Sequence, residues 1–177
     1  RTPPCTDAII RSGIVNVIIG SKDSDERVAG KGIKRLKEAG LNVIFGVAEK
    51  EALNLNKEFF FRIKHNRSWG ILKCAVSLDG RISLPNGESK WISSEESRKL
   101  VHSLRAKCDA VIVGTKTVKK DNPLLTSRGL KTPEPTRVIL TNSFNFSEKS
   151  QIFDTNIAKT IIAYGPEIDL KKLKKFD

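Results

Sequence analysis

The sequence predicts an α/β fold, because short apolar runs typical of strands alternate with stretches of helical period. Residues 15–19 and 41–45 are two such runs, and each is followed directly by a glycine. Between them, apolar side chains at helical spacing predict a helix over about residues 28–39, which Gly40 ends as a left-handed cap. A strand, a helix and a strand in about thirty residues form a βαβ unit with parallel strands, and we expect its first strand to be buried on both faces.

The remaining elements continue this alternation. We expect a short helix over residues 7–12 and a longer one over about residues 50–64. Ser94 can cap a further helix with its hydroxyl, while Glu95 and Glu96 favour the positive end of that helix. Strands are predicted over residues 69–76, 110–113, 137–141 and 160–163, with a glycine-started loop over residues 114–128.

A polar stretch at residues 65–68 is the predicted domain boundary, which separates residues 1–66 from residues 67–177. The net charge of +12 is spread over both parts, since 32 Lys and Arg stand against 20 Asp and Glu. Nucleic-acid-binding proteins usually concentrate positive charge on one face, and here only the lysines of residues 171–175 form a tight run. A solvated lysine-rich surface explains the charge best, and a basic nucleic-acid-binding module is the alternative.

The composition excludes several classes of protein. With 38% hydrophobic and 29% charged residues, the 177-residue chain is too apolar to be disordered. No apolar run is long enough for a membrane span, and the first residues lack the layout of a signal peptide. Three widely spaced cysteines favour a reducing environment over a disulfide framework. We expect a soluble, cytoplasmic protein, and the start at Arg1 without methionine predicts that the chain is the middle of something longer.

The densest candidate chemistry lies between Lys73 and Arg128. Hydroxyls, backbone amides and arginines gather there at the expected carboxyl ends of strands, an arrangement that suits an anionic ligand such as a phosphate. The glycines form neither a P-loop nor a dinucleotide-binding fingerprint. His65 and His102 have no cysteine or carboxylate at metal-ligand spacing, so neither indicates a metal site.

Six segments together, in their order and spacing, resemble the bifunctional riboflavin-biosynthesis deaminase/reductase family. The segments are residues 2–8, 28–32, 55–59, Lys73 with 77–81, 87–92 and 121–126. The resemblance implies the C-terminal part of a cytidine-deaminase-like domain, followed by the N-terminal part of a dihydrofolate-reductase-like domain. It also implies that both domains are incomplete in this chain.

The resemblance implies two activities for the full-length protein. A zinc deaminase would remove ammonia from 2,5-diamino-6-ribosylamino-4(3H)-pyrimidinone 5′-phosphate. A reductase would then use NADPH to convert the ribosyl chain of 5-amino-6-(5-phosphoribosylamino)uracil into a ribityl chain. Cys5 resembles the last zinc ligand of the deaminase, but the segments that carry the other ligands and the catalytic glutamate lie upstream in the family and are absent from this sequence. We therefore expect no deaminase activity from these 177 residues.

The resemblance also assigns roles in the reductase. It implies that Lys73 orients the ribose hydroxyls or the ring-opened imine for hydride attack. The NADPH contacts it implies are Ala75, Trp91, Thr117, Asp121 and Ser143. The substrate contacts it implies are Ser89, Arg105, Leu125 and Arg128, with Ser89 and the arginines facing the 5′-phosphate.

One departure weakens the resemblance at the cofactor site, because Asn142 stands where the family usually has aspartate before the serine that matches Ser143. Another NADPH-dependent reductase of the same fold is therefore a further alternative. The family's reductase domains commonly pair, so we expect a homo-oligomer. We expect a small phosphorylated pyrimidine as the partner, and neither a nucleic acid nor a membrane.

Overall fold

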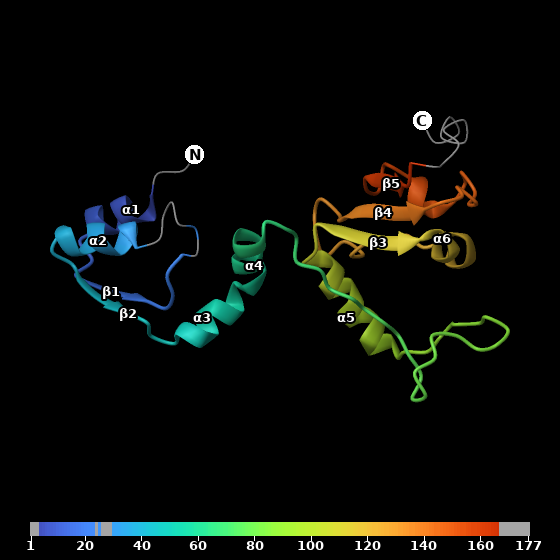
Figure 1. The fold of residues 1–177 in the computed structure, drawn as a ribbon, viewed down its shortest axis with the longest axis horizontal. Coiled ribbons are helices and arrows are strands. Elements are labelled where there is room, and N and C mark those ends of the chain that lie inside the picture. The colour runs from blue at the N-terminus through green and yellow to red at the C-terminus, as the bar shows by residue number, and fades with distance from the viewer. Residues whose placement is uncertain (1–3, 24, 26–29, 167–177) are drawn as a thin grey trace. The chain divides into compact units, whose positions relative to one another are not determined.

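The computed structural model describes residues 4–23, 25 and 30–166, and it contains two compact units, Arg1–Lys73 and Cys74–Asp177. The lysine run 171–175 and residues 28–29 of the predicted helix lie outside the described residues. Both units combine helices with a parallel sheet, which confirms the predicted α/β class (Figure 1). Within the described ranges, no helix is both long and apolar enough to cross a membrane.

The first unit opens with the predicted βαβ arrangement. Its elements are α1 (Cys5–Arg11), β1 (Asn16–Ile19), α2 (Lys31–Glu38) and β2 (Asn42–Phe45). The strands are parallel, with Asn16 opposite Asn42 and Ile19 opposite Phe45. Gly40 follows α2 at φ +85°, a conformation that glycine adopts without steric cost, so the predicted left-handed cap is confirmed.

The expectation that the first strand is buried on both faces is wrong. The side chains of β1 alternate between exposed and half-buried, and Ile18 is 66% exposed. Its neighbour in register, Ile44, is 48% exposed. An apolar run is buried on both faces only where helices cover both faces of the sheet. Here α1 and α2 lie together on one side of the two strands (Figure 1).

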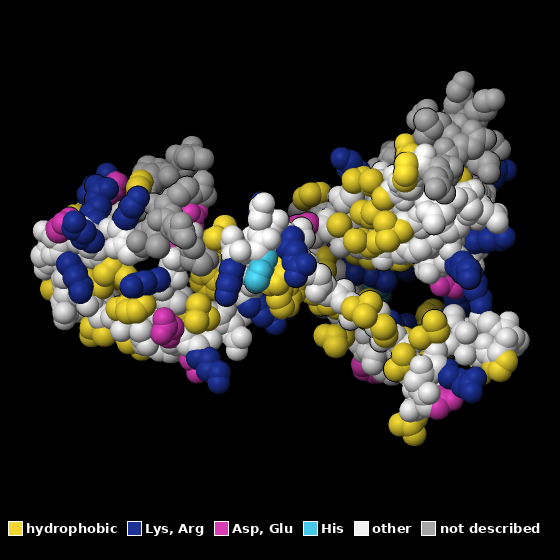
Figure 2. Space-filling model, viewed as in Figure 1, with side chains coloured by type: hydrophobic (Ala, Val, Ile, Leu, Met, Phe, Trp, Pro, Cys, Tyr) yellow, Lys and Arg dark blue, Asp and Glu magenta, His cyan; other side chains and the backbone are white. Residues whose placement is uncertain are grey.

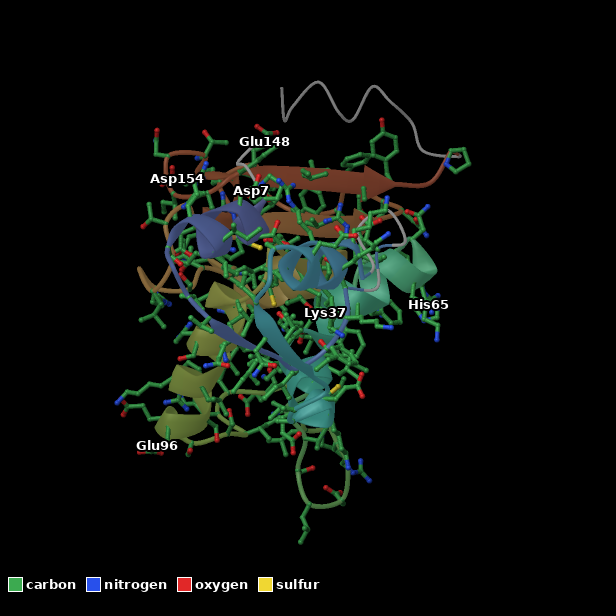
Figure 3. The ribbon with its side chains drawn as sticks, turned by 90° about the vertical axis from the view of Figure 1, so that its left-hand side faces the viewer. Asp7, Lys37, His65, Glu96, Glu148 and Asp154 are labelled. Carbon is green, nitrogen blue, oxygen red and sulfur yellow. The ribbon has the colours of Figure 1, made fainter. Side chains whose placement is uncertain are left out.

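The single helix predicted over residues 50–64 is two helices, α3 (Glu49–Leu55) and α4 (Lys57–His65). Asn56 separates them with non-helical angles, φ −116° and ψ 24°. Its side-chain amide donates a hydrogen bond to the carbonyl of Ala52 at 3.3 Å, a local bond that competes with the helical backbone pattern. His65 ends α4, where its exposed ring projects outward (Figure 3).

The second unit contains a three-stranded sheet whose order follows the chain. Its elements are α5 (Glu95–Ala106), β3 (Ala110–Gly114), α6 (Thr115–Asp121), β4 (Thr136–Thr141), the 3-10 helix η1 (Gln151–Phe153) and β5 (Thr160–Tyr164). Both strand pairs are parallel, so all three carboxyl ends meet at one edge. Ser94 caps α5 by accepting a hydrogen bond from the Ser97 amide at 3.2 Å, which confirms the predicted cap.

Two expectations for this region are wrong. The strand predicted over residues 69–76 is irregular, because that segment belongs to neither sheet and a strand requires a partner to complete its hydrogen bonds. The loop predicted over residues 114–128 contains α6 in its first half. Its polar composition suggested a loop, but Val118, only 1% exposed, anchors the helix against the sheet.

The core of the second unit lies on one face of its sheet. It consists of Val118 of α6, Leu125, Ile139 of β4 and Ile152 of η1. The opposite face of the same strands is open, and Ile112 remains 60% exposed there. Apolar side chains accordingly gather on the surface of this unit (Figure 2).

A buried cation joins β4 to the segment that leads into β5. Arg137 is 0% exposed, and its guanidinium donates hydrogen bonds to the carbonyls of Gln151, Asp154 and Ala158. Burial lowers the pKa of Arg137, and the carboxylate of Asp154 opposes that shift. The arginine therefore supplies donors to three carbonyls that leave the regular ladder.

Replacing Arg137 with methionine should destabilise the second unit by about 1 to 3 kcal/mol, because the buried Ala158 carbonyl would lose its donor and the carbonyls of Gln151 and Asp154 would each lose one of two donors. Chemical denaturation followed by circular dichroism would measure this loss. Arg81→Met is the matched control, since the Arg81 side chain is 67% exposed. Equal stabilities of the two variants would contradict the role assigned to Arg137.

Candidate functional site

A short loop after α6 holds the polar groups that converge most closely. Residues 125–129, here named the 125–129 loop, contain Leu125 at φ +57° and Arg128 at φ +60°, both in the left-handed region. Leu125, Thr126 and Ser127 are buried, whereas Arg128 is exposed. The loop thus packs its first part into the core and presents an arginine to solvent.

The helix α5 supplies the second arginine. Arg105 donates a hydrogen bond from its Nη1 atom to the carbonyl of Thr126 at 3.3 Å. Burial lowers the pKa of Arg105, and the nearby positive charge of Arg128 lowers it further. Two guanidinium groups are therefore held close enough to repel each other, an arrangement that favours a bound anion between or beside them.

His102 lies one turn before Arg105 and faces the same loop. Burial lowers its pKa below the usual value, the charge of Arg105 lowers it further, and a hydrogen bond with the Thr126 backbone opposes the shift. The imidazole is therefore predominantly neutral at neutral pH. Its buried Nδ1 atom has no hydrogen-bond partner among the described residues.

Glu134 binds the backbone of the 125–129 loop. Its carboxylate accepts hydrogen bonds from the amide of Ser127 at 2.6 Å and from the amide of Gly129 at 2.9 Å. Burial raises the pKa of Glu134, but the two amides, the Ser127 side chain and the charge of His102 together hold the pKa below its ordinary value. The two amides flank Arg128 in the chain.

A second group of polar atoms lies at the carboxyl edge of the sheet. The hydroxyl of Thr115, the first residue of α6, donates to the hydroxyl of Thr141, the last residue of β4, at 2.7 Å. The Thr141 oxygen also accepts from the amides of Ser143 and Phe144 at 3.2 Å and 3.1 Å. These contacts shape the turn that carries Ser143, whose side chain is exposed.

Thr117 and Asp121 lie on α6, which starts at this edge, and both are half-buried. A pocket of about 620 Å³ opens beside the end of α6. Its lining residues are Val118, Lys119, Asn122, Asn145, Phe146, Ser147, Lys149 and Ser150. None of the predicted site residues lines this pocket.

The segment before α5 carries three of the predicted residues. Trp91 is 72% exposed, and the guanidinium of Arg98 lies 4.3 Å from its ring centre. Arg98 also donates to the Ser93 carbonyl at 2.7 Å, so the stacked arginine is tied to the start of α5. Ala75 and Ser89 are half-buried, and Ser89 makes no hydrogen bond to the described residues.

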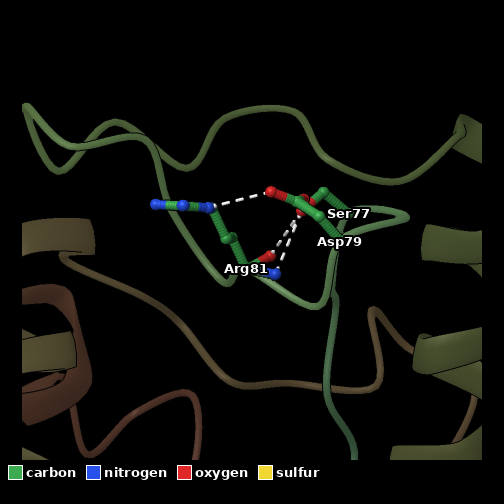
Figure 4. Close-up of polar contacts among 3 residues, drawn as sticks. All are labelled: Ser77, Asp79 and Arg81. Atoms are coloured by element: carbon green, nitrogen blue, oxygen red, sulfur yellow. Dashed lines mark hydrogen bonds and ion pairs between the residues drawn. The ribbon is translucent and has the colours of Figure 1, made fainter.

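A tight turn lies just after Ala75. Arg81 donates from Nε to the Asp79 carboxylate at 2.8 Å, while Ser77 donates to the same carboxylate (Figure 4). The Ser77 hydroxyl, followed by Arg81, lowers the pKa of Asp79. Asp79 and Arg81 are therefore paired with each other and are not directed to a ligand.

The two remaining predicted residues lie in the first unit. Lys73 is its last residue and is exposed. Cys5 is exposed at the start of α1. Within the described part of the chain, no group of three or more His, Cys, Asp or Glu side chains could hold a metal ion.

Comparison with known proteins identifies the family. A profile of the RibD C-terminal domain matches residues 68–177. The chain belongs to the RibD C-terminal domain family. This result confirms the family resemblance found in the sequence.

Relatives of known sequence match the whole length of the chain. The riboflavin biosynthesis protein RibD of Synechocystis is 48% identical over 177 residues, which are 100% of this chain and 48% of that protein. The RibD of Aquifex aeolicus is 44% identical and covers 99% of this chain, with 50% of its own length matched. The chain thus spans about half the length of the curated relatives it matches.

Solved RibD structures have the same fold. One is a diaminohydroxyphosphoribosylaminopyrimidine deaminase/5-amino-6-(5-phosphoribosylamino)uracil reductase of Thermotoga maritima, 40% identical, with a TM-score of 0.84 over 95% of this chain and 48% of that one. Another is the RibD of Acinetobacter baumannii, 32% identical, with a TM-score of 0.81 over 99% of this chain and 50% of that one. A dihydrofolate-reductase-like region in this chain is consistent with these neighbours.

The structure brings only part of the predicted site together. Arg105, Leu125 and Arg128 meet at the 125–129 loop. Sequence reasoning missed Glu134 and the Thr115–Thr141 pair. The sequence could have indicated this pair, because each threonine stands at or near the end of an expected parallel strand. No sequence signal distinguishes Glu134, which lies between two prolines in a connecting segment.

Replacing Thr141 with valine should destabilise the second unit by about 1 to 2 kcal/mol, because the amides of Ser143 and Phe144 would lose their buried acceptor while the side-chain shape is kept. Thermal and urea unfolding would measure the loss. Thr155→Val is the matched control, since Thr155 is exposed. A loss no larger than that of the control would contradict the role of the hydroxyl.

Proposed function

We propose that this chain contributes the reductase of riboflavin biosynthesis, which uses NADPH to reduce the ribosyl chain of 5-amino-6-(5-phosphoribosylamino)uracil to the ribityl form. The convergence of Arg105 and Arg128 on one loop carries the proposal, because two guanidinium groups suit a 5′-phosphate. The Thermotoga maritima relative, a 5-amino-6-(5-phosphoribosylamino)uracil reductase, supports it. In this proposal residues 1–66 belong to a cytidine-deaminase-like domain and residues 67–177 to the reductase domain.

The substrate contacts follow from the loop. Arg105, Arg128 and Ser89 would bind the phosphate, and the buried Leu125 would hold the loop against the core while its backbone borders the substrate. Arg128 is exposed and free to extend its guanidinium to a ligand, whereas Arg105 is restrained by Thr126. Lys73 would orient the ribose hydroxyls of the same substrate.

The predicted cofactor residues, which lie on α6, after β4 and in the segment before α5, would suit a phosphorylated dinucleotide. Thr117, Asp121, Ser143 and the backbone at Ala75 offer hydroxyl, carboxylate and amide groups of the kinds that bind ribose and phosphate. Trp91 exposes an aromatic face beside Arg98. NADPH, when bound, supplies the hydride. The protein's part is to hold the substrate in place and to surround its charge with donors.

The described residues do not fit a zinc site. Cys5 is a single thiol, and zinc requires three or four protein ligands. A deaminase centre that includes Cys5 would need ligands from outside the described residues, so no deamination step is assigned to this chain.

Two further proposals concern the setting of the enzyme. The open apolar faces of both sheets, with Ile18 and Ile112 among their exposed residues, favour a homo-oligomer in the full-length protein. The unpaired, mostly exposed cysteines suit the reducing environment of the cytoplasm. The substrate is a small phosphorylated pyrimidine, so neither nucleic acid nor membrane is needed.

Steady-state kinetics of the full-length protein test the function. NADPH oxidation should depend on the phosphorylated pyrimidine substrate. Arg128→Ala should raise the KM for that substrate by roughly thirtyfold and leave the KM for NADPH unchanged, because only a phosphate contact is lost. Arg81→Ala, which removes an arginine paired with Asp79, is the control and should change neither KM.

Equal losses for substrate and NADPH would argue against the substrate role of Arg128. Absence of NADPH oxidation by the unmodified protein would reject the proposed function. Binding to DNA that weakens steeply with added salt would instead favour the nucleic-acid alternative.

A further inference from the structure

An unexpected negative charge, that of Glu134, lies against the 125–129 loop. A carboxylate beside a phosphate site should weaken anion binding, because like charges repel each other. Glu134 nevertheless lies against the loop that carries Arg128, and His102 also interacts with its charge. The placement of its two oxygens explains what the carboxylate does there.

Both carboxylate oxygens of Glu134 are used by the backbone. Oε2 accepts from the amide of Ser127 and Oε1 from the amide of Gly129, which are the residues directly before and after Arg128. The negative charge is therefore directed at two amide dipoles. A carboxylate accepts such bonds more strongly than a neutral group does.

The backbone at Arg128 requires a restraint. A φ of +60° is uncommon for a residue with a side chain, because the Cβ atom crowds the backbone. A freely moving loop would leave this conformation and redirect the arginine. The bidentate grip of Glu134 on both neighbours of Arg128 opposes that movement.

The acceptor itself is firmly held. Glu134 stands between Pro133 and Pro135, whose rings fix their own φ angles, and Pro135 is fully buried. Within the loop, the hydroxyl of Ser127, which is 0% exposed, accepts from the amide of Lys131 at 3.1 Å. The loop is thus clamped between a rigid segment and the core.

We propose that Glu134 is a positioning residue of the phosphate site, which holds Arg128 in its left-handed conformation through the amides of Ser127 and Gly129. Glu134 touches no ligand and acts only through Arg128. The inference rests on the proposed function in so far as Arg128 binds the substrate phosphate.

A double-mutant cycle in the full-length protein tests this role. Glu134→Gln keeps the size of the side chain but offers one oxygen instead of two, so it should weaken the binding of ribose 5-phosphate roughly tenfold. In an Arg128→Ala background, the same change should weaken binding by less than about twofold, because the residue through which Glu134 acts is gone. Isothermal titration calorimetry measures all four affinities.

Steady-state kinetics distinguish a positioning role of Glu134 from a general loss of stability. Glu134→Gln should raise the KM for the phosphorylated pyrimidine while the KM for NADPH and kcat stay within about twofold. Glu134→Asp, which keeps the charge on a shorter stem, should restore part of the affinity. Glu148→Gln is the matched control, since Glu148 lies exposed at the surface of the same unit (Figure 3).

The role of Glu134 would be overturned if Glu134→Gln lowered the affinity for ribose 5-phosphate by the same factor with and without Arg128→Ala. It would also be overturned if Glu134→Gln alone left that affinity unchanged. If Glu134→Gln fails to fold, amide hydrogen exchange on the unmodified protein decides instead. Strong protection of the Ser127 and Gly129 amides supports the proposal, and rapid exchange at either amide overturns it.

The outcomes also separate the two proposals. If the unmodified protein does not reduce the substrate but the double-mutant cycle with ribose 5-phosphate gives the expected affinities, the proposed function is rejected and the positioning role of Glu134 is supported. If the protein reduces the substrate normally but the double-mutant cycle does not give the expected affinities, only the positioning role of Glu134 is rejected. Failure of the unmodified protein to bind ribose 5-phosphate rejects the phosphate site and the role of Glu134 together.

Discussion

The second unit depends on the burial of one cation. Arg137 lies in the central strand of the sheet, with no exposed surface, and its guanidinium bonds three backbone carbonyls from the segment between β4 and β5. A buried guanidinium is costly unless its donors find acceptors, and these carbonyls accept from Nη1 and Nη2, while the buried Nε has no hydrogen-bond partner among the described residues. The path of the chain from β4 to β5 is thereby determined.

The central strand β4 positions the residues of the candidate site. β4 begins next to Arg137 and ends at Thr141, whose hydroxyl binds Thr115 and organises the turn with Ser143. On the covered face of the sheet, Val118 and Leu125 pack with Ile139 of the same strand. Leu125 is also the first residue of the 125–129 loop, so core packing and the position of Arg128 are directly linked.

The loop and the sheet edge use the same physical device in different forms. At each place one side chain accepts two backbone amides from a turn: the Thr141 hydroxyl accepts those of Ser143 and Phe144, and the two Glu134 oxygens accept one each from the residues on either side of Arg128. Neither oxygen group is needed to contact a ligand. Both leave nearby hydroxyl or guanidinium groups available for one, in a parallel sheet whose carboxyl edge is the usual place for phosphorylated ligands.

The sequence by itself determined the α/β class, the βαβ unit, the caps at Ser94 and Gly40 and the family, because periodicity, capping residues and motif order are local properties of the chain. Only the tertiary structure decided that α6 replaces a loop and that β1 stays half exposed. It also brought Glu134 to the amides around Arg128 and Thr115 to Thr141. These outcomes depend on which distant segments cover a face or complete a hydrogen bond, and no local pattern encodes that information.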